Sequence, residues 1–197
     1  MNYPYIRIQM SSHHIVREKQ EPALLILALD GFEEEHLGQL LEWSPTVLVN
    51  EVSAEKLQSL GIKFDVLLSE TENEFLQEHL RLVQIQENAL QSGLQFLIGE
   101  KYPAVNIIAG KRSITDFLPF ADQITLVVFS NQQKIYPVSG GFSKWKAAGE
   151  VIEIAEVPAD LEQTGLKQIS QNQFKTKTDG FFTLKFAQPF LFIAEEI

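Results

Sequence analysis

The chain has 197 residues, of which 45% are hydrophobic and 14 are phenylalanine, so it can form one large domain or two small domains with a packed core. The formal net charge of -10 and the pI near 4.9 argue against nucleic acid and anionic membranes as partners, because no stretch gathers lysine and arginine into a basic stripe. Since cysteine is absent from the sequence, disulfides and thiolate chemistry are excluded.

Strand and helix signals alternate through the first part of the chain. Residues 23–29 form an unbroken apolar run that ends at Asp30-Gly31, which is typical of a central parallel strand buried on both faces. The acidic turn Glu33-Glu34-Glu35 suits the start of a helix, whose apolar face we expect to include Leu37 and Trp43. Further strands are expected at 46–49, 64–68, 83–85 and 104–109, and further helices at 53–60, 75–82 and 89–98. This alternation predicts a largely parallel sheet with right-handed crossovers.

The run at residues 23–29 is also the longest apolar stretch, and it is too short to cross a bilayer. Residues 1–20 lack the basic-then-apolar order of a secretory signal. We therefore expect a cytoplasmic protein that does not bind membranes.

Two carboxylates follow the strand expected at residues 64–68. Gly61 ends the preceding helix, and Glu70 and Glu72 stand at the exit of the strand. Open α/β sheets usually bind ligands in a crevice outside the carboxyl ends of their strands. The two acids therefore indicate either a ligand site at this exit or ordinary solvation of a loop.

A second strand exit carries positive charge. Gly110, Lys111 and Arg112 follow the strand expected at residues 104–109. A glycine next to two cations can hold a phosphate, although a solvated basic turn is an equally good interpretation.

From residue 124 the segments become short and β-rich. A hairpin is expected over 124–138, and later strands at 151–154, 180–186 and 190–193. The pattern predicts an α/β domain over 1–137 followed by a small antiparallel β-sandwich over 138–197. A module of that size should pack on the first domain or on a second subunit.

Several blocks of the sequence resemble the thiamin pyrophosphokinase family, and specifically a bacterial branch of it. Residues 11–26 and 37–45 carry most of the resemblance, and residues 60–68, 104–108 and 142–149 add to it. The resemblance implies a nucleotide-binding α/β domain and a carboxyl-terminal β-sandwich, paired as a homodimer whose interface shapes the thiamin cleft. It also implies Mg2+-dependent transfer of a diphosphoryl group from ATP to the thiamin hydroxyl, which yields AMP and thiamin diphosphate.

The metal-binding motif of that family is altered here. Its Gly-Asp-Phe-Asp signature falls on the four residues from Ser69 to Glu72, so that both acids become the longer Glu70 and Glu72 and the glycine is lost. Each added methylene moves the carboxylate oxygens by about an ångström, although glutamate can still ligate Mg2+. The acid one helix upstream falls on Glu51. The resemblance thus assigns Glu70 and Glu72 to the metal, with Asp65 and Glu51 behind them.

Three further functional blocks depart from the family pattern. A Thr-Asp pair that opens a long helix falls on Asn88 and Ala89, so its carboxylate is missing. A Gly-x-Arg-x-Asp-His block has its nearest counterpart at Lys111 and Arg112, without the Asp-His, and a Ser-Ser-Asn turn is replaced by residues 174–180. Glu51, Asn88, Lys111 and Arg112 are the candidate nucleotide-binding residues, with Lys111 or Arg112 on phosphate.

Functional blocks have thus changed while packing blocks remain, which separates the question of fold from that of catalysis. Three interpretations stay open. The chain is an active thiamin pyrophosphokinase, a catalytically inactive homologue that binds thiamin or nucleotide as a sensor or partner subunit, or a structural dimer without a ligand. The missing carboxylate at Ala89 favours the second and third.

Overall fold

The computed structural model describes residues 19, 21–71 and 80–197. Its main feature is a sheet of eleven strands, in the order β11-β12-β9-β14-β7-β6-β5-β1-β2-β3-β4. A second sheet of three strands has the order β10-β13-β8. In chain order the strands are β1 (Ala23–Ile26), β2 (Val47–Asn50), β3 (Val66–Ser69), β4 (Arg81–Gln84), β5 (Ala104–Ile108), β6 (Thr125–Ser130), β7 (Gln133–Val138), β8 (Phe142–Lys146), β9 (Val151–Ile154), β10 (Glu162–Thr164), β11 (Leu166–Gln168), β12 (Gln173–Thr176), β13 (Gly180–Lys185) and β14 (Leu191–Glu196).

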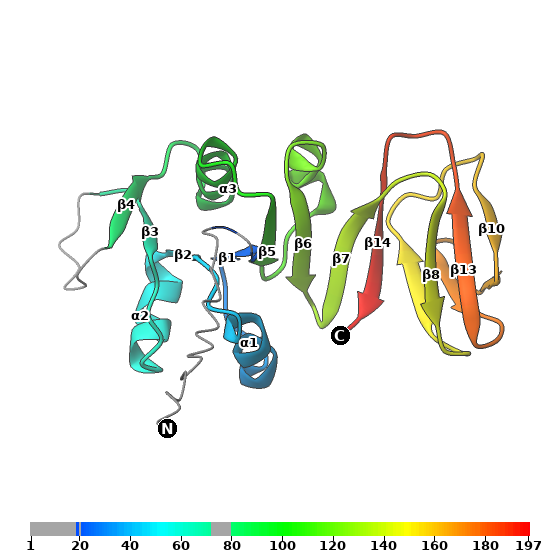
Figure 1. The fold of residues 1–197 in the computed structure, drawn as a ribbon, viewed down its shortest axis with the longest axis horizontal. Coiled ribbons are helices and arrows are strands. Elements are labelled where there is room, and N and C mark those ends of the chain that lie inside the picture. Colours follow the sequence, from blue (N-terminus) through cyan, green and yellow to red (C-terminus); the bar gives the residue numbers. More distant parts are fainter. Residues whose placement is uncertain (1–18, 20, 72–79) are drawn as a thin grey trace, which may run out of the picture.

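Strands β1 to β6 form the parallel part of the large sheet, which helices cover on both faces (Figure 1). Helices α1 (Glu34–Leu41) and α2 (Glu51–Ser59) lie on one face. Helix α3 (Ala89–Gly99) and the 3-10 turns η1 (Ile114–Asp116) and η2 (Leu118–Phe120) lie on the other. No helix in the described residues is long and apolar enough to span a membrane.

The helices on both faces of the sheet explain the unbroken apolar run at residues 23–29, which begins with β1. Leu24 and Ile26 point into the core under α1 and α2, whereas Leu25 and Leu27 point into the core under α3 and the 3-10 turns. All four side chains are at most 6% exposed. A strand that is buried on both faces has no position for a polar side chain.

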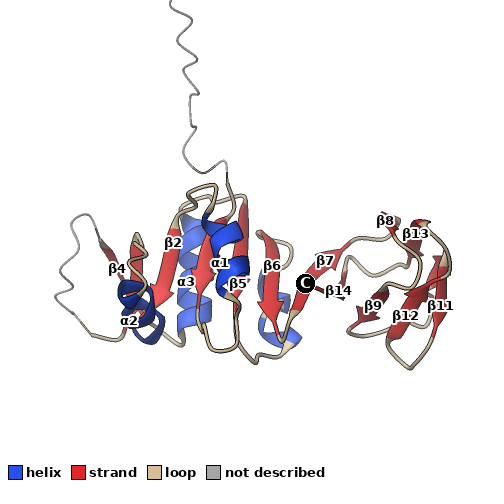
Figure 2. Cartoon of the chain, turned by 90° about the horizontal axis from the view of Figure 1, so that it is seen from below, coloured by secondary structure: helices blue, strands red, loops and turns tan. Residues whose placement is uncertain are grey.

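The antiparallel part of the large sheet begins at the hairpin of β6 and β7. Its two turn residues, Asn131 and Gln132, have φ values of 51° and 60°, as a two-residue type I′ turn requires. Strand β14, at the end of the chain, returns to pair with β7 on one side and β9 on the other. The sheet therefore continues from the α/β part into the carboxyl-terminal part without a break (Figure 2).

The three-stranded sheet packs on this antiparallel part. Phe142, Phe182 and Leu184 from the small sheet share one apolar cluster with Ile154 and Ile193 from the large sheet. The predicted mixed α/β architecture with antiparallel strands after residue 124 is confirmed. The sequence did not predict that the carboxyl-terminal strands would extend the first sheet.

Several local expectations were wrong. Residues 81–82 were expected in a helix, but they begin β4, which pairs in parallel with β3; residues 75–79 of that helix lie outside the described residues. Trp43 lies beyond the end of α1 and its side chain is 69% exposed, so it is not part of the apolar face of the helix. Helical spacing alone does not say where a helix ends.

Candidate functional site

The carboxyl ends of the six parallel strands lie at one edge of the large sheet, which we call the carboxyl edge. The strand order reverses between β1 and β5, because the chain adds β2, β3 and β4 on one side of β1 and β5 and β6 on the other. A ligand crevice of an open α/β sheet usually lies at such a reversal. The side chains that leave these strand ends are therefore the first candidates for a ligand site.

Asn50 connects two of these strand exits. Its side-chain Oδ1 accepts a hydrogen bond of 3.0 Å from the backbone N of Ser53 and so caps α2. Its Nδ2 donates at 2.9 Å to the carbonyl oxygen of Leu27, just beyond β1. The exit of β1 is thus fixed to the start of α2. Asn50 was not predicted from the sequence as a site residue, although an asparagine between an apolar strand and a helix is a recognisable cap signal.

Glu51 and Ser69 join the exits of β2 and β3. The hydroxyl of Ser69, which is only 2% exposed, lies 2.5 Å from Oε1 of Glu51. The backbone N of Thr71 donates to the same hydroxyl at 3.0 Å. Glu51 is the first residue of α2, where the helix dipole favours a negative charge. The Glu51 carboxylate is therefore held in place at the carboxyl edge.

Glu70 lies one residue beyond β3 and its side chain is exposed. Glu72, its predicted partner, lies outside the described residues. Within the residues that the structure describes, no group of three or more His, Cys, Asp or Glu side chains has the geometry of a metal site. The described carboxylates at this exit are therefore those of Glu51 and Glu70.

Asp65 lies at the opposite end of β3 from Glu70. The four residues of the strand lie between them, so five steps of about 3.3 Å separate the two by about 17 Å. The Asp65 carboxylate accepts a hydrogen bond of 2.8 Å from the backbone N of Val47, at the start of β2. The structure thus gives Asp65 a role in holding the amino ends of the strands, and does not bring it to the carboxyl edge.

Asn88 is the N-cap of α3. Its Oδ1 accepts a hydrogen bond of 3.0 Å from the backbone N of Gln91. Ala89 is the first residue of the helix, so no carboxylate stands at this helix start. The position of Asn88 is explained by helix capping alone.

The glycine and the two cations of residues 110–112 follow β5 at the carboxyl edge. Gly110 has a φ of +62°, and a Cβ at this position would lie 2.9 Å from the Cβ of Ala28, so the exits of β1 and β5 approach closely here. The carbonyl oxygen of Gly110 accepts a hydrogen bond from the Ser130 hydroxyl. Lys111 and Arg112 are both exposed, and neither forms an ion pair within the described part of the chain.

The basic and acidic exits share one edge but are not adjacent. Strands β5 and β3 are three places apart in the sheet, which corresponds to about 14 Å at the usual strand spacing. Lys111 and Glu70 could therefore contact the same ligand only if it lay along the edge, across the ends of β1 and β2.

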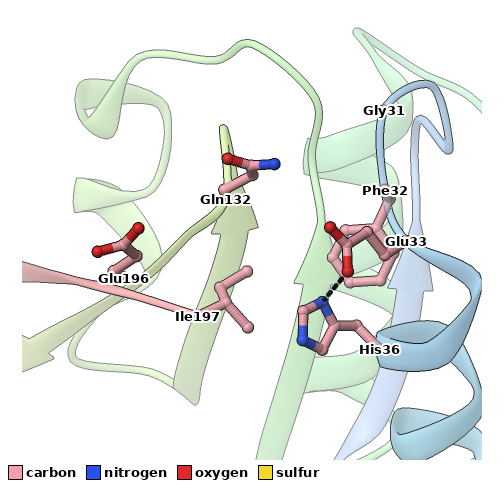
Figure 3. Close-up of a pocket in the computed structure, with 7 residues that line it drawn as sticks. All are labelled: Gly31, Phe32, Glu33, His36, Gln132, Glu196 and Ile197. Atoms are coloured by element: carbon pink, nitrogen blue, oxygen red, sulfur yellow. Dashed lines mark ion pairs between the residues drawn. The ribbon is translucent and has the colours of Figure 1, made fainter.

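A pocket of about 240 Å³ lies where the loop after β1 faces the end of the chain (Figure 3). Phe32, Glu33 and His36 line it on one side, and Gln132, Glu196 and Ile197 on the other, with Gly31 at the loop. His36 Nδ1 lies 3.7 Å from Oε2 of Glu33, and the Phe32 ring packs edge-on against Phe129 at 6.0 Å.

None of the metal-binding, nucleotide-binding or catalytic residues predicted from the sequence lines this pocket. Its charged side chains are those of Glu33 and Glu196, with His36 beside Glu33, so its chemistry does not suit a phosphate. Three segments that are far apart in the sequence form it. Only the glycine and the acidic turn after β1 could have been recognised as one side of a site.

Comparisons with known proteins agree with this fold. No protein-family model matches the sequence, and neither does any curated protein. Among solved structures, thiamine pyrophosphokinase from Bacillus subtilis matches 88% of this chain and 98% of its own, with 16% identity and a TM-score of 0.57. Thiamin pyrophosphokinase from Candida albicans matches 90% and 89%, with 10% identity and a TM-score of 0.66. The yeast enzyme matches 92% and 88%, with 10% identity and a TM-score of 0.61. The chain therefore has the fold of the thiamin pyrophosphokinases, and identities this low show the fold alone.

Proposed function

We propose that this thiamin pyrophosphokinase-like protein binds ATP with Mg2+ along its carboxyl edge and transfers a diphosphoryl group to the hydroxyl of thiamin. The products are AMP and thiamin diphosphate. The observation that carries the proposal is the Glu51 carboxylate, which Ser69 orients at the edge where α/β sheets bind their ligands. Similarity over about nine-tenths of the chain to structures named as thiamin pyrophosphokinases supports the choice of reaction.

The acids that would hold the metal are Glu70 and Glu72, with Glu51 beside them. Mg2+ is commonly bound through one or two carboxylates and completed by phosphate oxygens and water, so Glu51 and Glu70 provide suitable oxygen ligands. When bound there, Mg2+ would neutralise charge on the phosphates. Ser69 fixes the direction of the Glu51 carboxylate. The side chain of Glu70 is exposed and longer than the aspartate of the family motif, so it can adjust to the ligand.

The cations of the site are Lys111 and Arg112. Both are exposed and without an ion-pair partner among the described residues, so their charges remain available to phosphate oxygens. ATP would lie across the ends of β1 and β2, with phosphates between the acidic and basic exits. Because the whole chain carries a formal charge of -10, these two side chains and the metal must offset the repulsion of a polyanion.

A second candidate function is that of a catalytically inactive homologue, which binds thiamin or a nucleotide as a sensor or partner subunit. The specific observation in its favour is the start of α3, where Asn88 serves as a cap and Ala89 supplies no carboxylate. Asp65, at the other end of β3, does not replace it. A third candidate is a structural dimer without a ligand.

The proposal includes an assembly and a location. We propose a cytoplasmic homodimer with an α/β domain over 1–137 and a thiamin-binding β-sandwich over 138–197. The apolar cluster that the two carboxyl-terminal sheets share supports such a sandwich. Nucleic acid and membranes are not among the proposed partners, because the acidic composition disfavours both.

Incubation of the purified protein with ATP, Mg2+ and thiamin tests the reaction. AMP and thiamin diphosphate should appear in equal amounts. The double variant Glu51→Gln, Glu70→Gln should lower the rate by at least about tenfold, because glutamine is a poor ligand for Mg2+. The matched control is Glu55→Gln, Glu162→Gln, which removes the same charge from exposed positions outside the carboxyl edge and should keep the rate of the unaltered protein.

The outcomes separate the candidates. A saturable thermal shift with thiamin or ATP but without products would replace the proposed reaction by the binding function. If neither products nor a thermal shift were seen at millimolar ligand, the structural dimer would be the remaining candidate. If the double variant and its control lost the same amount of rate, Glu51 and Glu70 would not be ligands of the metal.

A further inference from the structure

A second pocket, of about 320 Å³, lies on the sheet face that carries α3. Three segments form it: residues 113–118 around η1 and η2, residues 153–156 at the end of β9, and residues 188–192 at the start of β14. Its volume is at the lower end of the range of small-molecule sites. None of the side chains discussed at the carboxyl edge lines it.

Apolar side chains form much of its wall. Phe190 and Phe192 lie edge to face, with ring centroids 6.0 Å apart. Ile114 and Leu118, from the 3-10 turns, line the same pocket, and Leu118 is 41% exposed although it is fully apolar. A ligand with an apolar body would remove this surface from water.

The charged groups of the pocket are all negative. Glu153 and Glu156 line it, and no lysine, arginine or histidine does. Oε1 of Glu153 accepts a hydrogen bond of 2.9 Å from Asn172, and the amides of Gln133 and Gln173 lie 3.5 Å from Oε2. These neutral amides orient the carboxylate without neutralising it, and neither glutamate forms an ion pair with another described residue.

We propose that this pocket binds a small organic cation, an amine or quaternary ammonium that carries one aromatic or aliphatic ring. The oriented Glu153 attracts the cationic group, and the apolar side chains of the wall strengthen that attraction relative to open solvent. The phenylalanine rings accommodate the apolar body and can face the cation. The two carboxylates repel an anion of the same shape. The inference goes beyond the reaction proposed above and does not depend on it.

Three probes of similar size separate charge from shape: benzyltrimethylammonium, benzamide and benzoate. The full chain with 13C-labelled isoleucine and leucine methyl groups reports binding through Ile114 and Leu118, which line the pocket. We expect a saturable shift of these methyl signals with benzyltrimethylammonium, a weaker one with benzamide and none with benzoate. No saturable shift with the cation, or equal affinity for benzamide, overturns the proposal.

Variants locate the charge that matters. Glu153→Gln, Glu156→Gln should weaken binding of benzyltrimethylammonium by roughly tenfold, since it removes both carboxylates. The control Glu55→Gln, Glu162→Gln changes the net charge equally outside the pocket and should leave the affinity unchanged. Because Glu156 is exposed, the single variant Glu156→Gln keeps the fold and should weaken binding to a smaller extent. Equal weakening in the control would mean that only the net charge acts, and would refute the site.

Discussion

Lys144 donates hydrogen bonds to both oxygens of the Glu195 carboxylate, at 2.9 Å to Oε1 and 2.6 Å to Oε2. Lys144 belongs to β8 in the small sheet and Glu195 to β14 in the large sheet. Glu195 is only 4% exposed. This buried ion pair therefore links the small sheet to the large sheet.

Two further groups complete the surroundings of Glu195. The Tyr136 hydroxyl donates to Oε1 at 2.7 Å, and Lys146 Nζ lies 3.2 Å from Oε2. Burial alone would raise the pKa of Glu195, but the hydrogen bonds from Lys144 and Tyr136, the charge of Lys144 and the bond from Lys146 outweigh it and hold the pKa below its usual range. Burial, together with the hydrogen bond to Glu195 and its charge, raises the pKa of Tyr136, so Tyr136 remains a donor.

Glu195→Gln should destabilise the protein by about 2 kcal/mol at neutral pH. Removing one partner of a fully buried pair costs about 3–5 kcal/mol. The cost is smaller here because Lys144 is 35% exposed and can return to water. Denaturant unfolding measures the change. The neighbouring exposed residue provides the control, since Glu196→Gln should stay within about 0.5 kcal/mol. Equal effects of the two variants would contradict a role of this ion pair in stability.

The contribution of Glu195 should depend on pH. Because its pKa in the folded state lies below the ordinary value of 4.5, the carboxylate stabilises the fold fully above that value. Its contribution is lost as the pH falls through the lower pKa of the folded state. The difference in unfolding free energy between the unaltered protein and Glu195→Gln should therefore be constant from neutral pH down to about 4.5 and shrink below it. Denaturant titrations over that range test this, and a difference that stays constant into strong acid would refute it.

The parallel part of the fold was readable from the sequence because its signals are local. Unbroken apolar runs marked β1 and β5, and Gly61, with a φ of +70°, ended α2 as expected. The continuation of the sheet was not readable, because β14 pairs with residues of β7 that lie 53 to 63 positions earlier, and no local pattern selects that partner. Strands β8 and β12, where no strand was expected, likewise form through pairing with distant neighbours.

The candidate site was readable in part for the same reason. A strand exit is a local feature, so Glu70, Lys111 and Arg112 were correctly expected after strands. The order of strands in the sheet decides which exits are adjacent, and it puts β1 and β2 between them. The contact between Ser69 and Glu51 also depends on that order, because neighbouring strands bring together residues 18 positions apart.

Gly110→Ala should destabilise the protein, whereas Gly38→Ala should stabilise it. At residue 110 the new methyl group would lie 2.9 Å from the Cβ of Ala28 in a left-handed backbone conformation, so we expect a loss of about 2 kcal/mol or more. Gly38 lies within α1 with no atom within 4 Å of its missing Cβ, and alanine there should add about 0.5–1 kcal/mol. Thermal and denaturant unfolding measure the change in unfolding free energy, and hence its sign, for each variant. If Gly110→Ala did not lower the stability, the exits of β1 and β5 would not approach as closely as described.

Replacing each capping asparagine by aspartate should distinguish their roles. Both side chains accept a hydrogen bond from a backbone N–H at a helix start, which aspartate can also do. Asn50 additionally donates from Nδ2 to the Leu27 carbonyl oxygen, and aspartate would put a charged oxygen there. Asn50→Asp should therefore cost about 1–3 kcal/mol, and Asn88→Asp should be within about 0.5 kcal/mol of the unaltered protein. Denaturant unfolding at neutral pH compares the two. Equal costs would mean that the Asn50 contact with Leu27 does not stabilise the exit of β1, and a large cost at Asn88 would show a role beyond capping.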